Sequence, residues 1–491
     1  MHALRLLLAA ALLVPLLAGC SDEPEAMLEP TPVDMPMAPV FAPDVVMPQA
    51  AGAGEPNIAI LPDGTLFVTA PVGGSPKPNV DEGAAYLWRS TDEGQTWTVV
   101  RSPHVGPSDQ LPQPGGAFCS CDADVTTSPD GWVYYSDWWI AGAVGPGNYM
   151  VEASGDSGES WASTPVTIPQ DLLAGVDRQW LVAGEDGLLG LFYSFYSPSP
   201  AGTLPIPAAG LDRAGQAILA VFSSDHGQTF GDPVAVVPAE QGTSYQIAHP
   251  FLAPNGTLMM AYGRVPDGDT FWLDESEVRL AWSTDHGATW QDKLLADVPL
   301  GFDNLWAVQG AVDASTGQST VVWASRLDGV KGDDVAATSH MGISVLQFGP
   351  LGTVGPVLVR ANGTNFLPWA AARDGTTAVG WYGGDATGDV TLARGDAAWY
   401  TYVAKAHGGL FTPGNITVSI VSTEPVKTGP LCPKGAACDG DRELLDYVSL
   451  VFDDAGLLHY AFASSRLDEG AFGGKNAYVH VANELPPLFD L

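Results

Sequence analysis

Apolar and polar residues alternate with a period of two along most of the chain after residue 50, and this pattern predicts β-strands. Seven times, two alternating runs flank a short turn, most often Asp-Gly or Asn-Gly, as in a β-hairpin. The predicted hairpins cover residues 55–68, 125–135, 180–193, 247–262, 307–323, 368–381 and 447–462. A second pair of strands follows each hairpin, such as 86–89 with 96–100. Seven units of about four strands predict an all-β fold with little helix.

A short motif of the form S-x-D-x-G-x-T/S-W/F occurs four times, starting at residues 90, 154, 223 and 283, which are 60 to 69 residues apart. The Ser and Asp side chains can hydrogen-bond the backbone of a tight turn, and the Gly permits a positive φ. The repeat is too long for a helical solenoid and suits one blade of a β-propeller. We therefore expect a structural role for the motif's aspartates, Asp92, Asp156, Asp225 and Asp285.

This motif resembles the Asp box of the bacterial neuraminidase repeat, and the chain resembles the sialidase-like β-propeller superfamily. The seven hairpins favour seven blades, and the six blades of the sialidases are the alternative. An open ring would leave sheet edges exposed, so the two ends of the chain should meet in one blade. We expect a strand near residues 40–46 to complete the last blade, beside strands at 447–452, 457–462 and 478–482.

The N-terminus has the pattern of an export signal, with Arg5 followed by an apolar run that ends at Leu17-Ala18-Gly19-Cys20. The last four residues resemble a lipobox, which implies a lipidated Cys20; an ordinary signal peptide is the alternative. Residues 21–50 are rich in Pro, Met and acidic residues and read as a tether. The expected organisation is a signal peptide (1–19), the lipidated Cys with its tether (20–50) and one propeller (51–491). The protein would be an exported lipoprotein that faces the periplasm or the cell exterior.

The chain carries 56 Asp plus Glu against 20 Lys plus Arg, a net charge of −36. Binding of nucleic acid requires clustered basic residues, so we exclude it. Acidic turns around Asp333 and Asp389 make Ca²⁺ an option, and no cofactor is expected. Four cysteines remain for disulfides in an exported protein: Cys119, Cys121, Cys432 and Cys438. Cys432 can pair with Cys438, or the two loops can pair with each other; a four-Cys zinc site is the functional alternative. We expect a monomer.

The innermost strands of a propeller line its axis, so the residues near the starts of these strands are candidates for ligand binding. The flat faces of aromatic side chains can pack against sugar rings, and the forked guanidinium group of arginine can orient a ligand. The candidate ligand-binding residues are Asp124, Asp177, Arg178, Trp180, His249, Trp306, Trp369 and Arg466.

The resemblance to sialidases also implies catalytic roles, which we transfer by matching segments. The segment 81–90 resembles the one that carries the family's acid/base, which implies Asp81. The segments 257–264 and 321–326 resemble strands that end in two of the three arginines that bind the substrate carboxylate, which implies Arg264 and Arg326. The segment 446–450 is similar to the nucleophile segment, which implies Tyr447. The tyrosine nucleophile is a known exception among glycosidases.

Two family residues have no counterpart here. The first blade reads Pro56-Asn57-Ile58-Ala59 where the family has Arg-Ile-Pro, and no acidic residue stands near Gln246, where a Glu should assist the Tyr. Two hypotheses therefore stand. In one, the axial cup recognises a glycan or protein without turnover; in the other, the protein is an exo-sialidase-type glycoside hydrolase.

Overall fold

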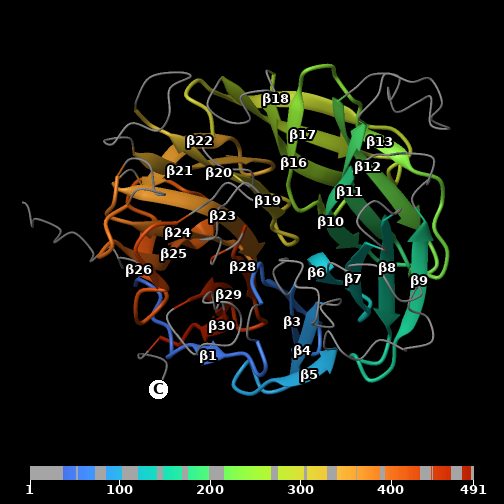
Figure 1. Cartoon of the computed structure of the whole chain (residues 1–491), viewed down its shortest axis with the longest axis horizontal. Coiled ribbons are helices and arrows are strands. Elements are labelled where there is room, and N and C mark those ends of the chain that lie inside the picture. The colour runs from blue at the N-terminus through green and yellow to red at the C-terminus, as the bar shows by residue number, and fades with distance from the viewer. Residues whose placement is uncertain are drawn as a thin grey trace, which may run out of the picture. The chain divides into compact units, whose positions relative to one another are not determined.

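The computed structural model describes residues 37–50, 53–71, 85–101, 120–140, 147–167, 175–197, 215–266, 275–302, 307–328, 340–360, 362–387, 393–431, 444, 446–465 and 478–487. Residues Pro36–Leu491 form one compact unit. The described strands of this unit form seven antiparallel sheets around a common axis (Figure 1). The prediction of a seven-bladed β-propeller is confirmed.

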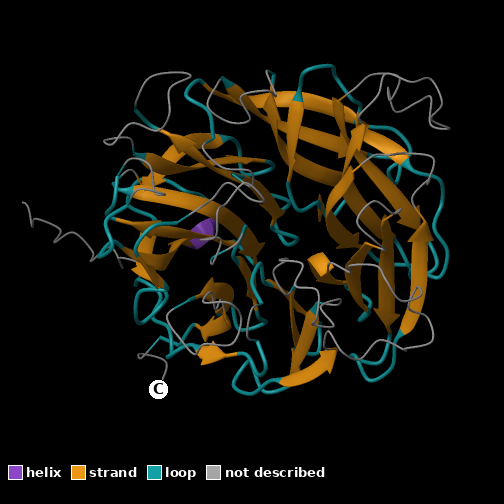
Figure 2. Ribbon diagram, in the orientation of Figure 1, coloured by secondary structure: helices purple, strands orange, loops and turns teal. Residues whose placement is uncertain are grey.

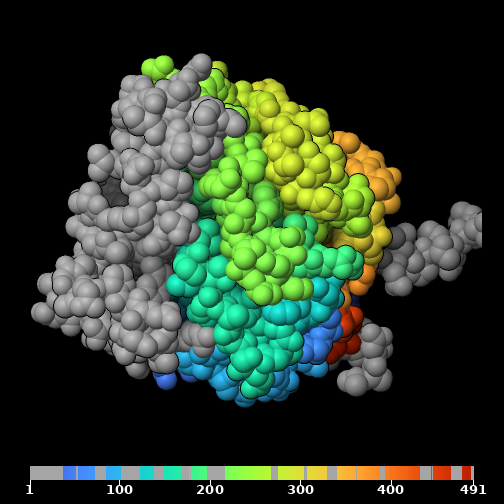
Figure 3. All heavy atoms as spheres, turned by 90° about the vertical axis from the view of Figure 1, so that its right-hand side faces the viewer, coloured from blue at the N-terminus to red at the C-terminus, as the bar shows by residue number. Residues whose placement is uncertain are grey.

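Each blade is a sheet of four or five strands, which we give from the innermost strand outward. Blade 1 holds β2 (Asn57–Ile60), β3 (Leu66–Ala70), β4 (Tyr86–Ser90) and β5 (Thr98–Arg101). Blade 2 holds β6 (Ser120–Thr127), β7 (Val133–Ile140), β8 (Gly147–Ser154) and β9 (Ala162–Thr167). Blade 3 holds β10 (Gly175–Ala183), β11 (Leu189–Ser197), β12 (Gly215–Ser223) and β13 (Val234–Val237). Figure 3 shows successive blades side by side, in colours from blue through green to yellow.

The next blades continue the ring. Blade 4 holds β14 (Ser244–Ile247), β15 (Phe251–Leu252), β16 (Leu258–Val265), β17 (Ser276–Ser283) and β18 (Gln291–Val298). Blade 5 holds β19 (Val308–Val312), β20 (Ser319–Arg326), β21 (Met341–Phe348) and β22 (Val354–Arg360). Blade 6 holds β23 (Thr364–Arg373), β24 (Thr376–Gly384), β25 (Ala398–Ala406), β26 (Ile416–Ile420) and β27 (Lys427–Thr428).

The last blade joins the two ends of the chain, as expected from the sequence. Blade 7 holds β28 (Ser449–Phe452), β29 (Leu458–Ser464), β30 (Tyr478–Asn483) and the N-terminal strand β1 (Val45–Val46). Val45 pairs with Val481 and Val46 with His480. Beside this pairing, His480 Nδ1 lies 2.5 Å from Asp44 Oδ2, and both side chains are buried. Strand β1 falls within the stretch 20–50 that the sequence assigns to the tether.

Helix is scarce in this fold. The described residues hold one short 3-10 helix, η4 (His407–Gly409), drawn in purple in Figure 2. Within the described part of the chain, no helix has the length and apolarity needed to cross a membrane. The apolar faces of neighbouring sheets pack against each other, and large aromatic residues such as Trp88, Trp381 and Trp399 are fully buried there.

The four S-x-D-x-G motifs form one kind of turn, which we call the repeat turn, between the third and fourth strands of blades 1 to 4. In the turn of blade 3, Ser223 Oγ accepts a hydrogen bond from Gly227 N (2.9 Å) and donates one to Asp225 Oδ1 (2.7 Å). Asp225 also accepts bonds from Thr229 N (2.9 Å) and Thr229 Oγ1 (2.6 Å). The aspartates Asp92, Asp156 and Asp285 make the same set of bonds.

Each repeat turn also contacts the preceding blade. Ser157 Oγ donates to Asp63 Oδ2 of blade 1 at 2.7 Å. His226 Nδ1 lies 2.9 Å from Tyr134 Oη of blade 2. The turn of blade 1 accepts a hydrogen bond at Gly94 O from Asn483 Nδ2 of blade 7 (3.0 Å). The motif therefore joins neighbouring blades, and its first copy helps to close the ring.

Candidate functional site

The inner strands begin at one end of the axis, and a backbone irregularity there places Arg178. Strand β10 shifts its register against β11 between Asp177 and Gln179, and Arg178 has a φ of 51°. A bulge of this kind bends a strand and redirects a side chain. Positive φ is uncommon for a residue with a Cβ, and such strained positions cluster at functional sites.

Arg178 is the centre of a group of charges that we call the axial charge cluster: Arg178, Glu55, Asp122 and Asp446. Arg178 Nη1 lies 3.1 Å from Glu55 Oε2 and 3.3 Å from Asp122 Oδ1, and Arg178 Nη2 lies 2.7 Å from Asp446 Oδ2. The four side chains are only 3–4% exposed. Burial alone would lower the pKa of Arg178, but the three carboxylates outweigh it and hold this pKa well above its ordinary value.

The cluster joins residues that are distant in sequence. Glu55 precedes the inner strand of blade 1, Asp122 lies in that of blade 2, and Asp446 precedes that of blade 7. Sequence reasoning finds three of these four residues, because Asp122, Arg178 and Asp446 all stand where an inner strand opens. It misses Glu55, whose position two residues before strand β2 is the signal that could have found it.

Four rings form a second layer, which we call the aromatic layer: Trp180, His249, Trp369 and Tyr447. Ring centroids are 5.0 Å apart for Trp180 and Tyr447, 5.6 Å for Trp180 and Trp369, and 5.3 Å for Trp180 and His249. The Arg178 guanidinium lies 5.2 Å from the centroid of Tyr447, so the charge cluster rests on this layer. Burial raises the pKa of the Tyr447 hydroxyl well above its ordinary value, and the hydroxyl donates to Ala123 O at 3.4 Å.

Asp124 links the aromatic layer to the backbone around the axis. Its carboxylate accepts a hydrogen bond from Leu181 N (2.5 Å) and one from Asn57 Nδ2. His249 Nε2 lies 3.3 Å from Asp124 Oδ2. The Asp124 side chain is completely buried, so these contacts hold neighbouring inner strands in register.

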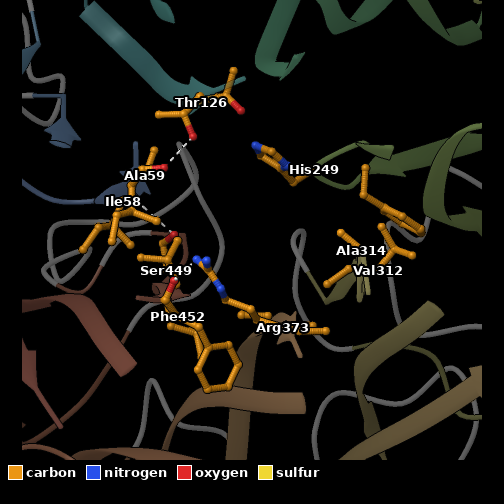
Figure 4. Close-up of a pocket in the computed structure, with 18 of the residues that line it drawn as sticks. Ile58, Ala59, Thr126, His249, Val312, Ala314, Arg373, Ser449 and Phe452 are labelled. Atoms are coloured by element: carbon orange, nitrogen blue, oxygen red, sulfur yellow. Dashed lines mark hydrogen bonds between the residues drawn. The ribbon is translucent and has the colours of Figure 1, made fainter. Parts of the chain in front are cut away.

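Beyond the aromatic layer, toward the hairpin turns, the axis contains a cavity of about 500 Å³. Figure 4 shows His249 and Arg373 pointing into this axial cavity, with Ser449 and Phe452 on one wall and Val312 on another. Trp369 also lines it. The volume falls in the range of small-molecule pockets. Arg373 forms ion pairs with Asp374 (3.4 Å) and Asp454.

The structure thus brings together at the axis six of the residues predicted from the sequence: Asp124, Arg178, Trp180, His249, Trp369 and Tyr447.

Arg264, another of the predicted residues, contacts a different group of side chains. Its guanidinium lies 2.7 Å from Glu240 and 3.3 Å from Glu277. Arg326 is buried at the end of β20. The predicted residues Asp81, Trp306, Arg466 and Cys20 lie outside the described residues, as does the side chain of Asp177.

The metal and disulfide predictions concern the same undescribed parts. Cys119, Cys432, Cys438, Asp333 and Asp389 lie outside the described residues, as does the side chain of Cys121. Among the His, Cys, Asp and Glu residues that the structure does describe, no group of three or more is placed to hold a metal ion.

Comparisons with known proteins add to the description of the fold. No protein-family model and no curated protein matches the chain. Among solved structures, an α-L-arabinanase of Penicillium chrysogenum in complex with arabinobiose is similar, with 15% identity over 90% of this chain and 98% of that chain (TM-score 0.46). An α-L-arabinofuranosidase of Fusarium graminearum shows 16% identity over 90% and 97% of the two chains (TM-score 0.44). A sialidase of Trypanosoma rangeli shows 12% identity over 74% and 54% (TM-score 0.40). At these identities the likeness concerns the fold and not the ligand.

Proposed function

We propose that this protein binds a carbohydrate at the axis of its propeller and is held at the membrane by a lipid on Cys20. The observation that carries the proposal is the convergence of charged and aromatic side chains from six blades on the axis. Blades 1, 2, 3 and 7 supply the axial charge cluster, and blades 3, 4, 6 and 7 supply the aromatic layer.

These side chains have the chemistry that sugar recognition needs. Carboxylates accept hydrogen bonds from hydroxyl groups, and the faces of Trp and Tyr rings pack against the C–H groups of a sugar. The side chains hold one another in place before any ligand arrives, since Arg178 is tied to three carboxylates and Trp369 stacks on Tyr447 (5.7 Å, 30°). Such preorganisation reduces the entropy lost on binding.

In the sialidase alternative, Tyr447 would act as a nucleophile. A tyrosine nucleophile needs its proton removed, and burial favours the protonated hydroxyl here. The contact with Arg178 acts in the opposite direction, because a nearby cation favours the phenolate. The role of Tyr447 as a nucleophile, with Asp81 as acid/base and Arg264 and Arg326 as carboxylate ligands, stays a prediction. We rank recognition without turnover above it.

A glycan array followed by calorimetric titration of the best ligand tests the proposal. The Trp369→Phe variant should weaken binding, because Trp369 lines the cavity and contacts three other rings of the aromatic layer. Trp97→Phe is a matched control, since Trp97 is similarly buried (8% against 6% for Trp369) but lies in the outer repeat turn of blade 1.

Three results would contradict the proposal or replace it. Absence of saturable binding by folded protein to any glycan would contradict it, as would equal loss of affinity in both Trp variants. Release of 4-methylumbelliferone from its sialoside, abolished in Tyr447→Phe, would establish the sialidase alternative instead.

A further inference from the structure

We propose that the axis selects neutral carbohydrates and rejects anionic ones such as sialic acid or uronic acids. This inference rests on the proposed function and names its ligand class. The reason is that the axial cations already form ion pairs with the protein's own carboxylates.

Arg178 of the axial charge cluster is the first of these paired cations. Arg178 presents its two Nη atoms to Glu55, Asp122 and Asp446 at 2.7–3.3 Å. Its backbone N–H is also engaged, since it donates to Asp122 Oδ2 at 3.0 Å. A ligand carboxylate that took one of these places would leave a protein carboxylate buried beside it, which is strongly unfavourable.

Basic side chains lie beside carboxylates at two further positions along the axis. At the aromatic layer, His249 Nε2 lies 3.3 Å from Asp124 Oδ2. At the cavity, Arg373 is paired with Asp374 and Asp454. Among the described residues, each of these basic side chains therefore lies beside at least one carboxylate, whichever end of the axis a ligand enters.

Arg264, which the sequence predicts as a carboxylate ligand, has an equivalent arrangement. It lies between Glu240 (2.7 Å) and Glu277 (3.3 Å). The pairing of β16 with β17 places Arg264 opposite Glu277, so this ion pair is built into the sheet. The chain as a whole adds a negative field, because its net charge is −36. From the loss of one buried ion pair, we expect an anionic sugar to bind roughly 100-fold or more weakly than its neutral counterpart.

The experiment uses pairs of glycans that differ only in charge. The array carries neutral glycans beside their sialylated or uronic-acid counterparts, for example lactose beside 3′-sialyllactose, and the best pair is then titrated. We expect the neutral member to bind and its counterpart to bind at least about 100-fold more weakly. Preference for the anionic member would overturn this inference and leave the proposed function standing. Binding of neither member to folded protein would overturn both.

Variants test whether the axial carboxylates cause the selectivity. Glu55→Gln keeps the shape of a cluster side chain and removes one negative charge, so the neutral-over-anionic ratio should fall. Asp374→Asn does the same at the cavity, and this side chain is 70% exposed, so the variant should fold even if Glu55→Gln does not. Glu484→Gln is the control, because Glu484 is a buried carboxylate paired with Lys405 (2.8 Å) between outer strands. An unchanged ratio in both Glu55→Gln and Asp374→Asn, or an equal fall in Glu484→Gln, would refute the assignment.

Discussion

The repeat turn of blade 4 depends on a glycine for two separate reasons. Gly287 has a φ of +87°, and a Cβ at this position would lie 2.3 Å from Cε2 of Phe222 in blade 3. The Phe222 ring has little room to move away, because Gly190 lies on another side of it, where an added Cβ would stand 2.8 Å from Cε1. Gly287→Ala should therefore strain the backbone and also separate two blades.

Gly256 allows the two effects to be measured apart. Its φ is +81°, and a Cβ there would meet no atom within 4 Å. Positive φ costs an alanine about 1–2 kcal/mol, which the lower entropy of the unfolded chain offsets by about 0.4–1 kcal/mol. Gly256→Ala should thus lose about 1 kcal/mol. Overpacking adds about 1–3 kcal/mol at Gly287, for a total of about 2–4 kcal/mol.

Urea unfolding of the wild type and both variants measures the difference, provided that the m-value stays the same. A third variant, Gly287→Ala combined with Phe222→Leu, should recover part of the loss, because the smaller side chain gives the new methyl group space. Equal losses in Gly256→Ala and Gly287→Ala, with no coupling to Phe222, would refute the claim that the repeat turn packs tightly on the preceding blade.

Three further predictions concern ring closure, acid stability and the membrane anchor. Asn483→Ala removes the hydrogen bond to Gly94 O (3.0 Å) and should cost about 1–3 kcal/mol in urea unfolding; unchanged stability would show that this contact does not hold the ring closed. Hydrogen bonds from Thr229 and Ser223 lower the pKa of Asp225 from 3.8 to about 2, so its stabilising effect should be complete above about pH 5 and be lost as the pH falls through about 2. The melting temperature of Asp225→Asn should accordingly be lower than that of the wild type at pH 6, and the difference should shrink at low pH. A difference in melting temperature that does not change with pH would contradict this. Cys20→Ala should abolish palmitate labelling and membrane retention, and normal retention would disprove the anchor.

The blades could be predicted from the sequence because each one is local. A hairpin and its following strands lie within about 45 to 65 residues, and the alternation of apolar residues marks the hairpins. The closing strand β1 could be predicted as well, since an open ring would leave an exposed edge. These inferences need only neighbouring residues and one rule about sheet edges.

The site could be predicted only in part, because its contacts join residues from different blades. The sequence picks out Arg178 and Tyr447 as single residues, but their contact spans the ring from blade 3 to blade 7. Arg264 is a residue whose predicted role and observed contacts differ. Its residue type suits a ligand carboxylate, whereas its pairing with Glu277 depends on the register between β16 and β17, which the sequence does not specify.

The repeat motif occurs in four blades, and different contacts join the blades that lack it. The repeat turns of blades 1 to 4 join four of the blade boundaries, and other contacts join the rest. Blades 4 and 5 meet through an apolar cluster that contains Phe251 and Met259. Gln347 of blade 5 donates to Gly409 O at 2.6 Å beside blade 6, and Lys405 of blade 6 pairs with Glu484 of blade 7 at 2.8 Å. At these two boundaries a polar contact takes the place of a repeat turn. A closed ring requires a contact at each blade boundary but does not specify the type of contact. The number of motif copies is therefore smaller than the number of blades.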